Sequence, residues 1–241
     1  GALRRTPMTR LKRLAAPRAW SIPRKTGTWV VRPSPGPHPR HRCIPLTIVL
    51  RDMLGYTDNA REAKAVIRAR QAHVDNRPVR DPGFPLGLMD TLSLPEVGEH
   101  YRVLLDTHGR FALVPIKEAE AGWKLARIEN KSLVRGGRTQ LNLSDGRNLL
   151  VENGHKTRDS LKIAVPSQEV QEVLPLKTGG VILLIGGKHV GQTGHVEEVV
   201  VERGSRPNQV RLKEGFSSVL DYAFVVGKQK PVIALPESTA A

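Results

Sequence analysis

The chain has 241 residues, of which 39% are hydrophobic and only 4% aromatic, and its formal net charge is +15. This length allows one large domain or two to three small ones, and the low aromatic content favours several small modules. The charge indicates a polyanionic partner, whereas the lack of any apolar run of about 18 residues or of a leading signal segment argues against a membrane. The single cysteine, Cys43, excludes an intramolecular disulfide and fits a reducing compartment.

Residues 1–42 are a basic, proline-rich segment that we call the arm. It contains eleven lysine and arginine residues, seven prolines and no acidic residue. Prolines lack the amide donor and the cations repel one another, so we expect an extended arm that is disordered in the free protein and becomes ordered on nucleic acid. A solubilising tail is the alternative, but Trp20 and Trp29 argue for burial against RNA or a neighbouring domain. The candidate RNA-binding residues of the arm are Arg10, Lys12, Arg13, Arg18, Arg24, Lys25, Trp29, Arg32, His38, Arg40, His41 and Arg42.

His38, His41 and Cys43 lie close together in the chain and raise the question of a metal site. No fourth ligand stands nearby at the spacing that zinc sites use. We therefore expect no bound metal.

Two short helices and a tight turn are expected after the arm. Pro45 suits a first helical turn, and the apolar spacing from Leu46 to Met53 predicts a helix that ends at Gly55. Residues 57–59 offer N-cap side chains for a second helix with Ala60, Ala63 and Ile67 on its inner face. Residues 75–76, Asp-Asn, tolerate the positive φ of a tight turn between strands.

The second helix also carries a basic stripe, formed by Arg61, Lys64 and Arg68. Such a stripe is often only a solvated face. Two short helices followed by a basic hairpin, however, resemble the S-four-type RNA-binding fold. In that fold the phosphate contacts would come from Arg51, Arg61, Lys64, Arg68, Arg77 and Arg80.

Two hairpins are expected further along, around residues 107–109 (Thr-His-Gly) and 144–146 (Ser-Asp-Gly). A second cation cluster lies between and beside these hairpins. It could be part of an exposed barrel surface or could contact RNA directly, and the sequence favours neither interpretation. Its members are Lys124, Arg127, Lys131, Arg135 and Arg138.

Glycine-rich turns dominate the C-terminal third. The Gly186-Gly187-Lys188 run is not a nucleotide-binding P-loop, because the pattern needs glycine at the position of Ile182 and Ser or Thr at the position of His189. Residues 181–185 and 196–201 instead predict strands, with the glycines in the turn between them. Glycines there let the backbone approach a partner and expose amides, and Lys188, His189 and Gln192 add side-chain donors for RNA.

Several longer strings resemble one family, the small-subunit ribosomal protein four of the archaeal and eukaryotic type. The most specific are RPSPGPHPRHR ahead of IPLTIVLRDML, QLNLSDGRN, and GGKHVGQTGHVEEV, and the resemblance runs from about residue 10 to about residue 230. It implies an α+β multi-domain protein: the arm (1–42), an S-four-type RNA-binding domain (43–92), a central β-rich domain (93–174), and an SH3-like barrel with a KOW motif (175–241).

The same resemblance implies a function. The chain would be a structural constituent of the small ribosomal subunit that binds folded ribosomal RNA, in its 5′ domain, beside other small-subunit proteins in the cytoplasm. No cofactor, small-molecule substrate or membrane is expected.

An enzyme is not expected either, because no nucleophile, base and orienting group stand in a recognisable arrangement. Two other classes stay open: an RNA-modifying enzyme that carries the same RNA-binding fold, and a transcription factor with a KOW motif.

Overall fold

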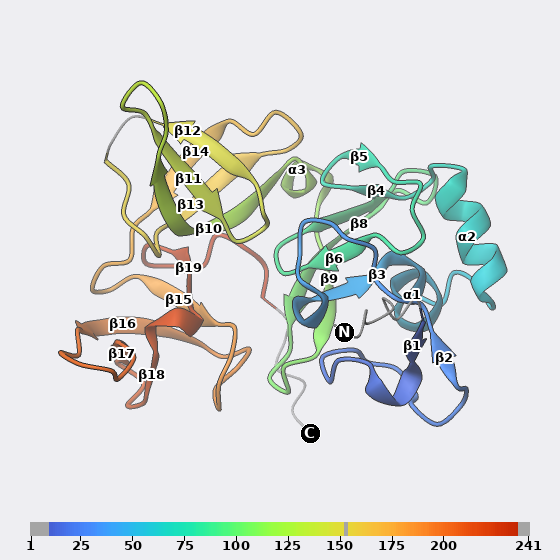
Figure 1. The fold of residues 1–241 in the computed structure, drawn as a ribbon, viewed down its shortest axis with the longest axis horizontal. Helices are drawn as coiled ribbons and strands as arrows, with labels where there is room; N and C mark the ends of the chain where they lie inside the picture. Colours follow the sequence, from blue (N-terminus) through green and yellow to red (C-terminus); the bar gives the residue numbers. More distant parts are fainter. Residues whose placement is uncertain (1–9, 152–153, 236–241) are drawn as a thin grey trace, which may run out of the picture.

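The structure, a computed structural model, describes residues 10–151 and 154–235. It contains three five-stranded antiparallel sheets, two two-stranded pairs and a few short helices (Figure 1). The expected mixture of strands and helices is therefore confirmed, with strands in the majority. No helix in the described ranges is long and apolar enough to cross a membrane.

The arm is folded from residue 10 onward. Strand β1 (Leu11–Lys12) pairs with β2 (Trp29–Val30), and 3-10 turns cover Arg13–Ala15 and Arg40–Arg42. Trp20 is only 2% exposed, and its indole Nε1 donates a hydrogen bond to the Cys43 carbonyl at 2.6 Å. The expectation of an arm that is disordered in the free protein is therefore wrong for residues 10–42, while residues 1–9 lie outside the described ranges.

The arm folds because apolar residues stand between its cations. Leu11, Ala16, Trp20 and Ile22 join the same hydrophobic core as residues 44–50. Their burial offsets the conformational entropy that the cations and prolines alone could not.

The first module follows the arm. Strand β3 (Cys43–Pro45) pairs with β6 (Pro85–Gly87), and α1 (Leu46–Ile48) continues as a π-helical turn over Val49–Met53 before α2 (Ala60–Arg68). Its sheet has the order β5-β4-β7-β8-β9, from β4 (His73–Val74), β5 (Arg77–Pro78), β7 (Thr91–Leu94), β8 (Glu99–Leu105) and β9 (Phe111–Pro115).

The predicted tight turn is confirmed, because Asp75 and Asn76 have φ of 50° and 59°. The expected boundary at residue 92 falls inside β7, and residues 99–115 complete this first sheet.

A short helix, α3 (Glu118–Ala121), leads into the central sheet. The order is β12-β11-β10-β13-β14, from β10 (Trp123–Leu133), β11 (Thr139–Leu143), β12 (Asn148–Val151), β13 (Ser160–Ala164) and β14 (Val170–Leu174). Both predicted hairpins are present, with Gly109 and Gly146 at positive φ in their turns. Ala126, Ile128 and Leu141 belong to the small apolar core of this sheet.

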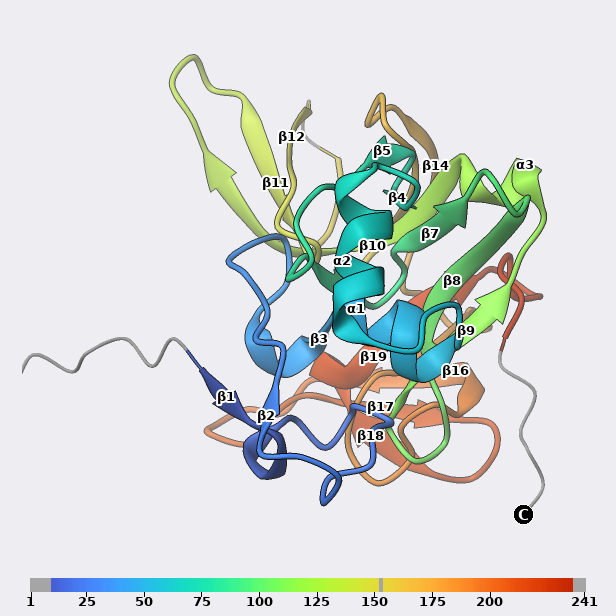
Figure 2. The ribbon, with the colours of Figure 1, turned by 90° about the vertical axis from the view of Figure 1, so that its right-hand side faces the viewer.

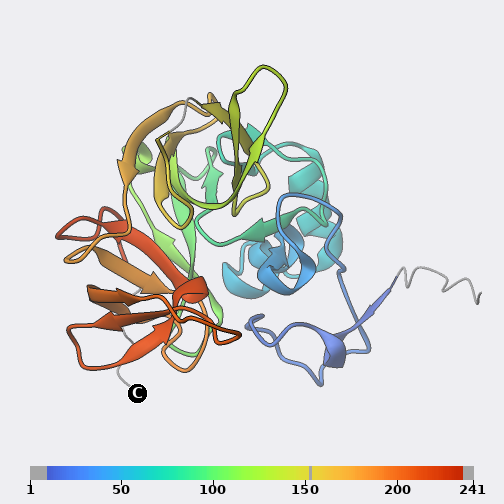
Figure 3. The same cartoon turned by 60° about the vertical axis from the view of Figure 1, so that its left-hand side comes forward.

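The last sheet, which we call the C-terminal sheet, has the order β18-β17-β16-β15-β19. Its strands are β15 (Val181–Leu184), β16 (Thr193–Val200), β17 (Gln209–Leu212), β18 (Ser217–Val219) and β19 (Ala223–Gly227), with a 3-10 turn at Leu220–Tyr222. The predicted strands around the glycine-rich turn are confirmed. Figures 1 and 3 show this sheet and helix α2 at opposite ends of the molecule.

Candidate nucleic-acid interface

Helix α2 presents the basic stripe to solvent. Asn59 caps the helix, because its side-chain oxygen accepts hydrogen bonds from the amides of Arg61 and Glu62. Ala63 and Ile67 are fully buried against the core, which turns the opposite face outward. Arg61, Lys64 and Arg68 are all exposed there, so their side chains are free to reach phosphate oxygens.

The hairpin after α2 adds two exposed cations, Arg77 and Arg80. The Arg77 guanidinium donates one hydrogen bond to the Pro166 carbonyl at 3.2 Å, which ties the hairpin to the central sheet. Arg51 is different, because it is partly buried and pairs with its neighbour Asp52 at 2.7 Å. Its guanidinium is thus partly neutralised within the chain.

Most arm cations lie at the surface, and one aromatic residue accompanies them. Trp29 is 50% exposed, and the Arg10 guanidinium lies 5.8 Å from the centre of its ring. The exposed members of the predicted set are Arg10, Lys12, Arg18, Lys25, Trp29, Arg32, Arg40, His41 and Arg42.

Three other residues of the arm that were predicted to bind RNA have hydrogen-bond partners within the chain. Arg13 is buried and donates to the Pro23 carbonyl and the Thr26 hydroxyl. Arg24 donates to the carbonyls of Ala16 and Pro17. These guanidinium groups hold the turns of the arm together.

His38 is the third, and it is not at the surface. Its ring is buried, and Nε2 lies 2.9 Å from the Asp90 carboxylate. A Cβ added to Gly87 would lie 2.3 Å from the ring, so glycine leaves the space that the imidazole occupies. His38 therefore docks the arm on the first module and is not part of the interface, so its predicted RNA contact is wrong.

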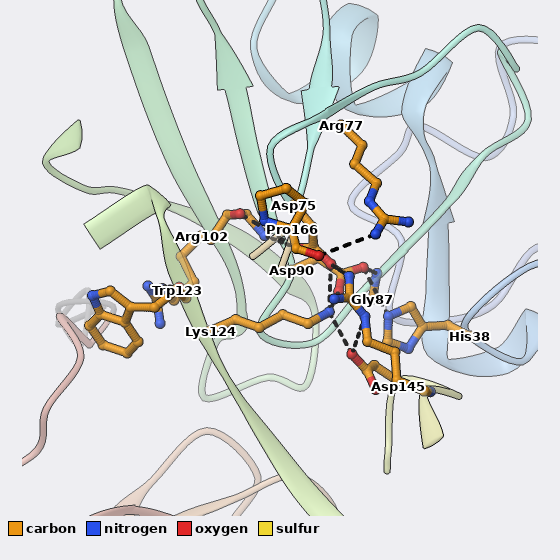
Figure 4. Close-up of polar contacts among 12 residues, drawn as sticks. His38, Asp75, Arg77, Gly87, Asp90, Arg102, Trp123, Lys124, Asp145 and Pro166 are labelled. Atoms are coloured by element: carbon orange, nitrogen blue, oxygen red, sulfur yellow. Dashed lines mark hydrogen bonds and ion pairs between the residues drawn. The ribbon is translucent and has the colours of Figure 1, made fainter. Parts of the chain in front are cut away.

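His38 belongs to a buried charge cluster at the junction of arm, first module and central sheet (Figure 4). Lys124 Nζ is its centre, at 2.6 Å from Asp75 and 2.9 Å from Asp90. It also lies 2.7 Å from Asp145 Oδ2, as an ion pair without aligned hydrogen-bond geometry. Arg147 bridges Asp75 at 2.5 Å and Asp145 at 3.1 Å. The charge cluster consists of His38, Asp75, Asp90, Lys124, Asp145 and Arg147.

The electrostatics of the charge cluster favour a protonated His38. Burial by itself would lower the pKa of His38, but the charge of Asp90 and the hydrogen bond to it raise the pKa above 6.5. Burial by itself would likewise raise the pKa of Asp90, but His38 and Lys124 hold it below its usual range. Burial, and then the charge of Asp90, raise the pKa of Asp75. When all three carboxylates are ionised, their charges are balanced by Lys124, Arg147 and a charged imidazole.

Two residues of the second cation cluster are buried, against expectation. Lys124 is 1% exposed and Arg127 is also buried, so neither an open surface nor RNA contact describes them. Arg127 donates to the carbonyls of Asp221 and Ala223 and thereby joins β10 to the C-terminal sheet. Their apolar neighbours in the string WKLARI were the available signal of burial. Lys131, Arg135 and Arg138 of the same cluster are exposed.

The C-terminal turn uses its glycines for contacts within the chain. A Cβ on Gly191 would lie 2.2 Å from the Asp106 carbonyl oxygen, and Gly186 faces the Tyr222 ring in the same way. His189 stacks on Phe216 with ring centres 4.3 Å apart, and its Nδ1 lies 3.0 Å from the Gln192 side chain. Lys188 and Gln192 remain exposed at this turn.

Among residues 10–151 and 154–235, no group of three or more His, Cys, Asp and Glu side chains could hold a metal ion. His38 pairs with Asp90, and the Cys43 thiol donates to the Arg40 carbonyl at 3.7 Å. His38 and Cys43 therefore interact with other groups of the chain and not with each other.

Together these features define a class: a strand-rich protein of several joined modules whose exposed cations are spread over an arm, a helix and a hairpin. Two family models match the chain, the ribosomal family S4e over residues 97–170 and the RS4NT (NUC023) domain over residues 5–41.

Curated relatives cover almost the whole chain. The small ribosomal subunit protein eS4 of Methanothermobacter thermautotrophicus is 44% identical over 230 residues, which is 94% of this chain and 95% of the relative. That of Methanocaldococcus jannaschii is 43% identical over 242 residues, which is 95% of this chain and 98% of the relative. The chain belongs to the ribosomal S4e family, which consists of ribosomal proteins and not of enzymes.

A solved structure agrees with this assignment. The crystal structure of the 30S ribosomal protein S4e from Thermoplasma acidophilum matches with a TM-score of 0.69 and 30% identity, over 78% of this chain and 96% of that one. The resemblance and the expectation of a protein without catalytic activity are therefore confirmed.

Proposed function

We propose that this chain is a structural component of the small ribosomal subunit that binds and stabilises folded small-subunit ribosomal RNA. The observation that carries the proposal is the 40–44% identity, over more than nine-tenths of the chain, to proteins named as small ribosomal subunit protein eS4. The ribosome, the cytoplasm and neighbouring small-subunit proteins follow as location and partners, and the 5′ domain of the RNA is the proposed site.

The geometry supports this role through the basic stripe of helix α2. Arg61, Lys64 and Arg68 are exposed on one side of a helix whose other side is buried, so they can contact phosphates without any change in the fold. Arg77 and Arg80 extend the cationic surface onto the next hairpin. Guanidinium groups pair with phosphate in two parallel hydrogen bonds, which suits closely packed RNA helices.

The domain roles form part of the proposal. The arm and the first module would supply most phosphate contacts, and the charge cluster would hold them in a fixed relation to the central sheet. The C-terminal sheet would be an SH3-like barrel with a KOW motif, in which Lys188 and Gln192 are the exposed donors. Gly186 and Gly191 would serve the packing of that barrel more than RNA contact.

Sucrose-gradient fractionation of a lysate at low and moderate salt tests the proposal. The protein, detected by antibody, is expected in the small-subunit fractions. Co-migration with RNA polymerase would support a transcription factor instead, and a free protein at the top of the gradient at both salt concentrations would also refute the ribosomal role.

A further inference from the structure

The side chains on one face of strands β10, β11 and β12 form an array without charges. Ser132, Gln140 and Leu150 are cross-strand partners in one row. Asn130, Asn142 and Asn148 are partners in the next row. Cross-strand partners lie on the same side of a sheet, so these six residues share one surface, which we call the amide face.

The amide face points away from the core. The alternate residues of the same strands, such as Leu141 and Leu143, are buried in the apolar core of the central sheet, and Leu149 packs against it. On the amide face, by contrast, Asn130, Ser132, Asn148 and Leu150 are exposed, and Gln140 and Asn142 are partly exposed. The apolar side chain of Leu150 is 54% exposed.

Hydrogen bonds within the array orient its amide groups. The Gln140 side-chain amide donates to Asn142 Oδ1 at 2.9 Å. Asn142 Nδ2 in turn donates to the Ser132 hydroxyl at 3.2 Å. A surface whose polar groups are already held in place loses less entropy when a partner docks.

We propose that the amide face docks on the shallow minor groove of an RNA double helix, an inference that rests on the proposed ribosomal function. That groove displays ribose 2′-hydroxyls and base edges, which both donate and accept hydrogen bonds. Asn, Gln and Ser side chains can also donate and accept, whereas Lys and Arg can only donate. Leu150 would pack on the apolar side of a ribose.

Charge complementarity favours RNA over a protein partner for this face. The β10–β11 hairpin reaches beyond the rest of the sheet (Figure 2), and its turn carries the exposed cations Arg135 and Arg138. Phosphates border the groove on both sides, so the hairpin turn would meet a phosphate strand while the amide face meets the groove. The whole chain, at +15, is attracted to the same partner.

The amide face and the hairpin turn are expected to respond differently to salt, because one makes neutral hydrogen bonds and the other contacts phosphates. Neutral hydrogen bonds release no counterions, so the contribution of the amide face is independent of salt, while each phosphate contact adds about 0.7 to 0.9 to the slope of log K against log salt. Two variants of the full chain separate these effects: Q140A/N142A on the amide face, and R135Q/R138Q at the hairpin turn.

The test measures binding to small-subunit ribosomal RNA over a range of salt concentrations, after melting curves have shown that each variant folds. Q140A/N142A is expected to bind about tenfold more weakly with an unchanged slope. R135Q/R138Q is expected to flatten the slope by about 1.4 to 1.8. Asn148→Ala, on the edge strand, is a second amide-face variant that leaves the Gln140–Asn142–Ser132 hydrogen bonds in place, and it is expected to weaken binding about threefold.

A second measurement examines the groove itself with an RNA duplex of about 16 base pairs and its 2′-O-methylated form. Wild type is expected to bind the methylated duplex more weakly, and Q140A/N142A to bind the two duplexes equally. Equal binding of both by wild type, or no binding of the RNA duplex, would overturn the inference.

The outcomes also separate this inference from the proposed function. Absence of any salt-dependent binding of ribosomal RNA by wild type would refute the function. Strong binding by wild type together with full affinity of both amide-face variants would overturn only the inference. If those variants keep full RNA affinity but enter small subunits poorly, the amide face binds a protein and the RNA assignment is wrong.

Discussion

Gly191 and Asp106 pack so closely that no side chain fits between them: a Cβ on the glycine would lie 2.2 Å from the carbonyl oxygen of the aspartate. The contact joins the turn after β15 to the hairpin between β8 and β9. Two residues that are 85 positions apart in the chain therefore bring the first and the last sheet together, and the contact requires a residue without a Cβ.

Gly191→Ala is expected to destabilise the protein by about 2 to 4 kcal/mol, as the sum of overpacking and of strain at φ 78°. Gly179→Ala is the matched control, because its φ is 83° and nothing lies within 4 Å of the added Cβ. The control is expected to lose only about 1 to 2 kcal/mol. Urea unfolding of both variants measures the difference. An equal decrease in the free energy of unfolding would show that the close contact with Asp106 does not add to the cost of the substitution.

Trp20→Ala is expected to lower the free energy of unfolding by about 3 to 5 kcal/mol, because it opens a cavity in the shared core and removes the hydrogen bond to Cys43. Trp29→Ala, at a half-exposed site of the same arm, should change stability by no more than about 1 kcal/mol. Thermal melting of the two variants is the measurement. If Trp20→Ala melts like wild type, the arm does not contribute to the core.

Lys124→Met leaves three buried carboxylates without their central cation. A loss of about 3 to 5 kcal/mol is expected, since an unpaired buried charge costs more than the ion pair contributed. Lys131→Met, on the exposed part of the same strand, should lie within about 0.5 kcal/mol of wild type. Denaturant unfolding compares them, and a tolerated Lys124→Met would mean that the carboxylates are stabilised in another way.

His38 is expected to make stability depend on pH near neutrality. Its pKa is raised in the folded state above 6.5, so protonation favours the folded protein. The stabilisation is complete below the unfolded-state pKa and is lost as the pH rises through the folded-state value. The groups that face the imidazole, and so determine this response, are Asp90, Lys124 and Asp145, with Asp75 and Arg147 behind them.

The measurement for His38 is the free energy of unfolding between about pH 5 and pH 9, for wild type and for His38→Gln. The difference between the two should shrink as the pH rises. His41→Gln, at an exposed neighbouring position, is the control and should keep the wild-type profile. A constant difference between wild type and His38→Gln would show that the imidazole does not titrate in the charge cluster.

Changing Arg61, Lys64 and Arg68 together to Gln should weaken binding to small-subunit RNA while the melting temperature stays within a few degrees of wild type. Each lost phosphate contact is expected to reduce the salt slope by about 0.7 to 0.9. The matched control changes three exposed lysines of the C-terminal third, Lys177, Lys213 and Lys230, to Gln, which removes the same charge. If the two triple variants lose RNA affinity equally, the net charge of the protein determines binding and the stripe has no specific role.

Local features were predictable because neighbours in the chain determine them. The turn at Asp75 and Asn76 and the hairpin at Gly146 follow from residues that tolerate positive φ. The inner and outer sides of α2 follow from the helical period, which places Ala63 and Ile67 opposite the cations. For the same reason the stripe of the candidate interface could be predicted, and the family could be identified from its strings.

The partners of buried charges could not be predicted in this way. Lys124 and Arg127 look like surface cations in the sequence, and His38 looks like part of a basic arm. Their partners lie far away: Asp90 is 52 residues from His38 and 34 from Lys124, and Asp75 is 49 residues from Lys124. No periodicity connects such positions.

The sequence by itself thus determined the turns, the short helices, the exposed stripe and the family, since each depends on local spacing or on a continuous string. The tertiary structure alone decided that the arm folds onto the first module, that three modules meet around Lys124, and that Gly191 touches Asp106. The physical reason is that a buried charge or a close backbone contact is stable only when groups from distant segments arrive together to desolvate and neutralise it.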